Sequence, residues 1–212
     1  MRLDRSVALR EPESSYNEVR EYCRETREVL DRLEYDVIES VIQEFIKLKR
    51  RWGRLFVLGS GGSAANASHA VNDFRKLAGF DAYCPSDNVA ELTARINDEG
   101  WETSYANWLK VSRLGFNDLV LVLSVGGGSL EPPVSVNLIH AMDYAYEMGA
   151  RIVGIVGRDG GYTKTLAKAC IIIPTVNEHR VTAHVESFQS VFCHMIATDS
   201  RVSIAKGKWE SL

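Results

Sequence analysis

Four side chains of this sequence have the types and spacing for proton transfer or metal binding. His69 and Asp73 are four residues apart in a segment of helical pattern, so both lie on one helix face. Glu186 and His194 lie in a second helical segment near the C-terminus. Imidazole and carboxylate groups serve as general acids and bases or as ligands of a divalent metal such as zinc. A histidine and an aspartate at this spacing also form ordinary hydrogen-bonded surface pairs.

Spacing limits the metal interpretation. Glu186 and His194 are eight residues apart, which is about 12 Å of rise if both are helical. One ion could bind both only if Glu186 precedes the helix proper or comes from a neighbouring subunit. The helical pattern predicts that this last helix begins near residue 186 and ends near residue 197.

Residues 59–63, Gly-Ser-Gly-Gly-Ser, follow a short apolar run and lead into the helical segment of His69. We call them the first serine loop. Glycines let the backbone approach an anion closely, and the hydroxyls of Ser60 and Ser63 can donate to its oxygens. A plain strand-to-helix turn is the alternative interpretation.

A similar loop, residues 124–129, follows the third apolar run, and we call it the second serine loop. Ser124 and Ser129 can face the first serine loop across a crevice and form a phosphate pocket. Neither loop has the lysine spacing of a nucleotide-binding P-loop. No acidic residue ends the next strand, where Cys84 and Pro85 stand in place of a ribose-binding carboxylate. A phosphate-bearing small molecule therefore fits better than a dinucleotide.

Apolar and helical segments alternate along the chain, which predicts the elements that position these residues. Five short apolar runs read as strands, at residues 55–58, 82–84, 119–123, 152–156 and 170–173. Helical patterns fall between them, at residues 64–77, 89–96, 103–113, 134–148 and 163–168. The pattern predicts an α/β fold, a three-layer αβα sandwich with a five-stranded parallel sheet of flavodoxin-like type, with ligands at the carboxyl ends of the strands.

Apolar positions at helical spacing also fill residues 13–51, which predicts one long or two consecutive amphipathic helices before the first strand. This helical lead-in can cover the sheet or pack against a second copy of the chain. We predict a single domain over residues 1–212, with the lead-in at 13–51 and the αβα core at 52–212.

Composition excludes several classes of protein. The 212 residues are 45% hydrophobic and carry a formal net charge of −3, so no global positive field indicates nucleic acid. Residues 1–6 run into charged sequence without an apolar signal segment, and no run is long enough to span a bilayer. Four scattered cysteines without CxxC spacing indicate neither a disulfide framework nor a zinc ribbon. We therefore expect a cytoplasmic protein with no nucleic-acid or membrane partner.

With these motifs in order, the sequence resembles the sugar isomerase (SIS) domain family, and within it the phosphoheptose isomerases. The resemblance covers most of the chain: the helical lead-in, both serine loops, His69, residues 97–98, residues 157–161 and the last helix with His194. It implies an aldose-ketose isomerase of carbohydrate metabolism that converts sedoheptulose 7-phosphate to D-glycero-D-manno-heptose 7-phosphate through an enediol, feeding heptose biosynthesis. It also implies a homotetramer with active sites between subunits.

The resemblance also implies roles for single residues. Asp73 and His194 fall on the catalytic pair, and His69, Asp73, Glu186 and His194 fall on a set that binds zinc in some members. The substrate-binding positions that the resemblance and the loops indicate are Ser60, Gly61, Gly62, Ser63, Asp98, Ser124, Gly126, Ser129 and Glu186.

Three positions depart from the family pattern. Asp73 stands for a glutamate, Glu186 for a glutamine, and Gln189 for a histidine found in many members. The second serine loop is also poorer in hydroxyls, because Val125 and Gly126 carry none. Two alternatives stay open: an isomerase of another phosphosugar, and a noncatalytic sugar-phosphate-binding or adaptor protein, since the family contains such members.

Overall fold

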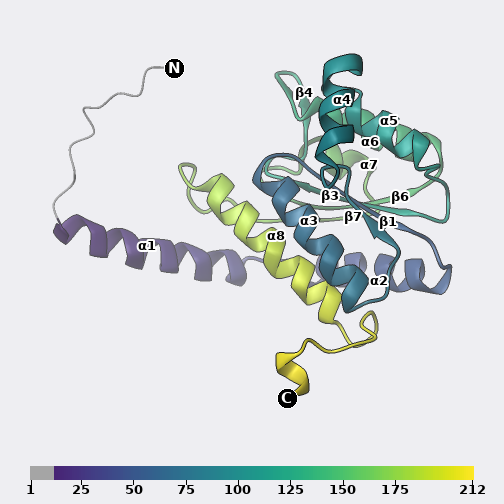
Figure 1. Ribbon diagram of the computed structural model, residues 1–212. Helices are drawn as coiled ribbons and strands as arrows, with labels where there is room; N and C mark the ends of the chain where they lie inside the picture. The colour runs from purple at the N-terminus through teal and green to yellow at the C-terminus, as the bar shows by residue number, and fades with distance from the viewer. Residues whose placement is uncertain (1–11) are drawn as a thin grey trace.

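The computed structural model describes residues 12–212, so the prediction made from residues 1–6 lies outside the described residues. Two helices, α1 (Pro12–Asp31) and α2 (Tyr35–Arg50), precede an alternation of strands and helices (Figure 1). The elements that follow are β1 (Leu55–Gly59), α3 (Gly62–Lys76), β2 (Ala82–Tyr83), α4 (Val89–Glu99), α5 (Ser104–Val111), β3 (Leu119–Ser124), β4 (Ser129–Leu130), β5 (Pro133–Val134), α6 (Val136–Glu147), β6 (Arg151–Val156), α7 (Gly161–Leu166), β7 (Ala169–Ile172), α8 (Val181–Thr198) and a short 3₁₀ turn, η1 (Trp209–Ser211).

The central sheet has five parallel strands in the order β2-β1-β3-β6-β7. Every residue of β1 and β3 is buried, which explains why these strands read as continuous apolar runs. The predicted fold class is confirmed. The strand order reverses direction between β1 and β3, where a doubly wound sheet opens a crevice for ligands.

Two hydrophobic cores cover the two faces of the sheet. On one face, α2, α3 and α8 pack against strand residues such as Val57, Leu121 and Ile155. On the other, α5 and α6 cover residues such as Phe56, Leu58 and Val122. Because α3 and α8 share a face, they lie side by side in Figure 1 and bring His69, Asp73 and His194 onto neighbouring helices.

The lead-in is two helices. The second, α2, covers the sheet with Val41, Phe45 and Leu48, each fully buried. The first, α1, extends away from the body of the molecule (Figure 1) and contacts it through the C-terminal half of the helix. There Glu25 is 1% exposed and pairs with Arg180 at 2.9 Å and His184 at 2.8 Å.

One local expectation was wrong: the last helix begins at Val181, five residues before the expected start near 186. Residues 129–134 form a two-stranded antiparallel hairpin, β4 and β5, which the apolar pattern did not predict. Within residues 12–212, no helix is both long enough and apolar enough to cross a membrane.

Candidate active site

The first serine loop connects β1 to α3 at the carboxyl edge of the sheet. Gly61 caps the helix with φ +63° and ψ −130°, a conformation that only glycine adopts easily. The buried Tyr105 hydroxyl anchors the loop by donating to the Gly59 carbonyl at 2.8 Å. Ser63, in the first turn of α3, is 1% exposed, and its Oγ has no hydrogen-bond partner. A buried hydroxyl without a partner at a helix N-terminus can donate to a bound anion.

Asn137 adds a second polar group without a full set of partners beside this loop. Its Nδ2 donates to Ser60 Oγ at 3.3 Å, while its buried Oδ1 has no partner among the described residues. Asn137 lies in the first turn of α6, which follows the second serine loop. The amide therefore connects the first serine loop to the start of α6.

The second serine loop is held by internal hydrogen bonds. Ser124 Oγ accepts from the Gly127 N–H at 3.1 Å, and Ser129 Oγ donates to the Glu131 carbonyl at 3.1 Å. Gly127 and Gly128 have φ of +75° and +85° and turn the chain back. Since β1 and β3 are paired strands, the structure brings the two serine loops to the same edge of the sheet.

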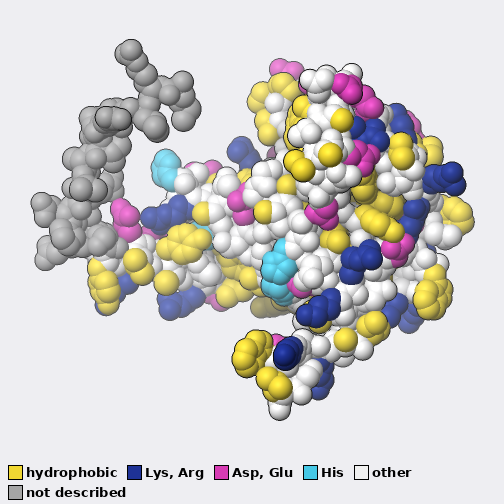
Figure 2. All heavy atoms as spheres, in the orientation of Figure 1, with side chains coloured by type: hydrophobic (Ala, Val, Ile, Leu, Met, Phe, Trp, Pro, Cys, Tyr) yellow, Lys and Arg dark blue, Asp and Glu magenta, His cyan; other side chains and the backbone are white. Residues whose placement is uncertain are grey.

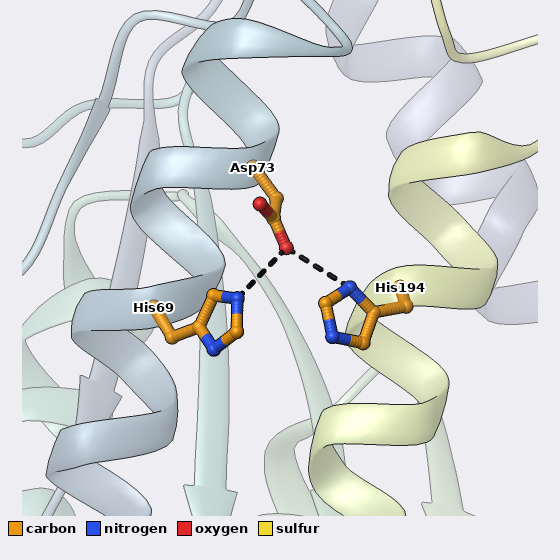
Figure 3. Close-up of side chains that lie close together, drawn as sticks. All are labelled: His69, Asp73 and His194. Atoms are coloured by element: carbon orange, nitrogen blue, oxygen red, sulfur yellow. Dashed lines mark ion pairs between the residues drawn. The ribbon is translucent and has the colours of Figure 1, made fainter. Parts of the chain in front are cut away.

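His69, Asp73 and His194 come together farther along α3 and α8, and we call them the His–Asp–His cluster (Figure 3). Asp73 Oδ2 lies 3.4 Å from His69 Nε2 and 3.0 Å from His194 Nδ1. The Asp73 side chain is only 11% exposed, while the two histidines are about half exposed, at 54% and 51%. Figure 2 shows histidine side chains at the surface over these helices. The cluster is thus a buried carboxylate between two accessible imidazoles.

Three helix-to-helix hydrogen bonds set the register that brings the cluster together. Asn66 Nδ2 donates to Gln189 Oε1 at 3.0 Å and to the Glu186 carbonyl at 2.8 Å, and Ser190 Oγ donates to Asn66 Oδ1 at 3.0 Å. Gln189 is fully buried. Asn66 lies seven residues before Asp73 and Ser190 four before His194, so the bonds lie one to two turns from the cluster. The sequence reasoning missed Asn66 as a positioning residue, although its place on the His69 helix was a usable signal.

The cluster has the donor atoms of a metal site. One ligand atom from each of the three residues lies within 4.8 Å of the others. Asp73 Oδ2 is buried without a hydrogen-bond partner, although two ring nitrogens lie within ion-pair distance. Two imidazoles and a carboxylate with one position left open fit a zinc site. Burial, and secondarily the charge of Asp73, raises the pKa of the neighbouring Cys193 thiol to about 12.

Two predicted site residues lie apart from the cluster. Glu186 is inside α8, so the helical rise separates it from His194, and its carboxylate packs against Gly62 at the start of α3. Glu186 therefore cannot join His194 on one ion within a single chain, which removes one of the two arrangements that the sequence left open. Asp98 is exposed near the end of α4 and accepts a hydrogen bond from Asn97 at 2.7 Å.

The fold and these two features define a class of protein: a doubly wound α/β domain with two glycine- and serine-rich loops at the carboxyl edge of its sheet and a His–Asp–His cluster on α3 and α8. No family model matches the chain. A phosphoheptose isomerase of Roseiflexus sp. (strain RS-1) is 30% identical over 166 residues, covering 76% of this chain and 80% of the relative. The lincomycin biosynthesis protein LmbN of Streptomyces lincolnensis is 33% identical over 154 residues, covering 68% of this chain and 54% of that protein.

Comparison of the fold with solved structures gives a similar result. The structure of phosphoheptose isomerase GmhA from Neisseria gonorrhoeae superposes with a TM-score of 0.73 at 22% identity, covering 87% of this chain and 95% of that one. The chain belongs to the phosphoheptose isomerase family of sugar isomerase (SIS) domain proteins.

Proposed function

We propose that this protein is an aldose-ketose isomerase that converts sedoheptulose 7-phosphate to D-glycero-D-manno-heptose 7-phosphate. The observation that carries the proposal is the position of Asp73 Oδ2 between two imidazoles on a chain of this family. A protein that only bound a sugar phosphate would need the serine loops but not this acid/base set. The cluster therefore favours the enzyme over the noncatalytic alternative.

The reaction moves a proton between two adjacent carbons through an enediol. It requires a base at carbon, an acid for the oxygens and stabilisation of developing negative charge. Asp73 and His194 lie 3.0 Å apart, so one can remove and return the carbon proton while the other exchanges protons with the oxygens. Ser63, with its unpartnered hydroxyl, and Ser124 bind the phosphate at the carboxyl edge of the sheet.

The same cluster supports a zinc site. His69 Nε2, Asp73 Oδ2 and His194 Nδ1 would be the ligands. When bound, a divalent cation supplies polarisation of the carbonyl and hydroxyl oxygens. Glu186 becomes a fourth ligand only if a neighbouring subunit supplies it.

Two observations support active sites shared between copies of the chain, as in the homotetramer that the resemblance implies. Asp73 is ten residues beyond Ser63 on one helix, about 15 Å along its axis, so one substrate must span that length within a single chain. Beside the half-exposed histidines, Val191 and Met195 of α8 are 45% and 41% exposed. A second copy that covers this apolar surface would also bring its own serine loops to the cluster.

Isomerase activity is tested by incubating the purified chain with sedoheptulose 7-phosphate and separating the two heptose phosphates by chromatography. We expect turnover, and a loss of kcat of about 100-fold or more in Asp73→Asn and in His194→Ala. Unchanged turnover in both variants would remove the proposed mechanism. A cytoplasmic location stays a prediction from the sequence.

The relative LmbN favours one second candidate, an isomerase of a different phosphosugar, because a lincomycin biosynthesis protein is as similar to this chain as the phosphoheptose isomerases are. A panel of ketose phosphates of five to eight carbons in the same assay distinguishes the two. The proposed function predicts the highest kcat/KM for the seven-carbon substrate.

A further inference from the structure

A groove of about 540 Å³ lies beside the second serine loop, on the side of the loop nearer β6. Gly126 and Ser129 of the loop form one wall, and the β4–β5 hairpin continues it. Arg158, Asp159, Gly161 and Tyr162, from the segment after β6, also line the groove. Gly126 and Ser129, two of the predicted phosphate-binding positions, therefore line the same groove as residues of the β6–α7 connection.

The second serine loop has few free donors of its own. Residues 125–128 carry no side-chain hydroxyl. The Ser129 hydroxyl donates its proton to the Glu131 carbonyl, and the Gly127 N–H is bonded to Ser124 Oγ. Among the side chains of this loop, only the Ser124 hydroxyl keeps a proton free to donate, so a phosphate bound here can take a further donor from elsewhere.

The β6–α7 connection is attached directly to this loop. Thr163 donates to the Gly127 carbonyl through its N–H at 2.9 Å and its Oγ1 at 2.8 Å. The Tyr162 N–H donates to the Gly128 carbonyl at 2.9 Å. A side chain on this connection is therefore held in a fixed position relative to the loop.

Arg158 extends from that connection along Gly126. A Cβ atom placed on Gly126 would lie 3.4 Å from Arg158 Cδ, so the arginine stem lies beside the position where a serine side chain would begin. Arg158 has φ +55°, an uncommon conformation for a residue with a side chain. The arginine is exposed, and its guanidinium makes no hydrogen bond or ion pair with the residues whose side chains the structure describes, 16–212. It is the sole basic residue among the described residues that line the groove, whose acidic residues are Glu131 and Asp159.

We propose that Arg158, whose stem lies beside Gly126, binds the phosphate group of the substrate. Its guanidinium would supply the N–H donors in place of the side-chain hydroxyls that the second serine loop lacks. A guanidinium presents paired N–H donors that match phosphate oxygens in a bidentate geometry. This assignment rests on the proposed function for the identity of the sugar phosphate. The phosphate contact itself depends only on the groove, the loop and the arginine.

The test compares Arg158→Gln with the wild-type chain in two measurements: KM for sedoheptulose 7-phosphate, and affinity for inorganic phosphate by titration calorimetry. We expect both to weaken by about tenfold or more, as for loss of a hydrogen bond to a charged group, with a smaller change in kcat. Arg158→Lys keeps the charge but not the paired donors, so its KM should lie between that of the wild-type chain and that of Arg158→Gln.

The chain offers a matched control and a rescue. Arg113 is also an exposed arginine with positive φ, +52°, but it precedes β3 at the opposite edge of the sheet, so Arg113→Gln should leave both measurements unchanged. In Arg158→Gln, the further change Gly126→Ser places a hydroxyl in the space that the arginine stem leaves. We expect it to recover part of the lost phosphate affinity.

Equal KM and equal phosphate affinity in Arg158→Gln and the wild-type chain would overturn the proposal, as would a wild-type chain that does not bind phosphate. Phosphate binding that depends on Arg158, in a chain without heptose isomerase activity, would instead overturn the proposed function and keep this inference.

Discussion

Asp73 shows how a shorter side chain is accommodated. Family resemblance places a glutamate at this position, and an aspartate reaches roughly 1 to 1.5 Å less far, a displacement that can slow proton transfer. In the structure, Asp73 nevertheless lies within 3.4 Å of both imidazoles. Ala70 is 1% exposed and lies on α3 between Asn66 and Asp73, so little side-chain volume separates α3 from α8 there. The aspartate therefore reaches both imidazoles despite the missing methylene.

At the same scale, the ligand set predicts metal dependence. After dialysis against a chelator, we expect kcat to fall by about tenfold or more and to return on addition of zinc. Elemental analysis should find about one metal ion per chain in the wild-type protein and little in His69→Ala, with His140→Ala, a histidine outside the cluster, as the control. Full activity in metal-free protein would show that the cluster works through proton transfer alone.

The helices place these residues through a few buried polar contacts. Asn66 holds α3 against α8, and Glu25 holds the end of α1 against the start of α8. Tyr22 adds to the second contact by stacking on His184, with ring centroids 4.7 Å apart. Periodicity predicted that these helices exist, because each has an apolar face. It could not predict which polar residues pair, since their partners are more than a hundred residues away.

The Glu25 contact gives a pH-dependent prediction. Although burial opposes it, hydrogen bonds from Asn177, His184 and Arg180 lower the pKa of Glu25 from 4.5 to about 2. A lowered carboxyl pKa means that this contribution to stability is complete above about pH 4.5 and is lost as the pH falls towards 2. We therefore expect faster amide hydrogen exchange in α1 over that range, relative to α2, in the wild-type protein.

Glu25→Gln removes the charge at neutral pH and should increase exchange in α1 without acid, at a cost of about 3 kcal/mol for a broken buried ion pair. Glu21→Gln is the matched control, because Glu21 is on the same helix but pairs with Arg24 at the surface, where solvent screens the pair, so its loss should leave exchange in α1 near that of the wild-type chain. Equal exchange in the two variants would show that Glu25 does not anchor the helix.

For the whole molecule, the proposal of shared sites predicts complementation. Ser63→Ala impairs the phosphate loop and Asp73→Asn the cluster, so each variant alone should be nearly inactive. If one copy supplies the loops and another the cluster, mixed assemblies contain some sites with both parts intact. Co-expression of the two variants should then restore a measurable fraction of wild-type activity. Activity no higher than that of the separate variants would show that each chain contains its own site.

The sequence by itself determined the fold class, the five strands of the parallel sheet, the two serine loops and the pairing of His69 with Asp73. These features are encoded locally, in buried apolar runs, in glycines at tight turns and in the four-residue helix repeat. The tertiary structure decided which distant residues meet. It brought His194 to Asp73, placed the Glu186 carboxylate at Gly62 instead, and laid Arg158 along the second serine loop. Contacts of this kind depend on how helices and strands pack against one another, and one residue of register changes them.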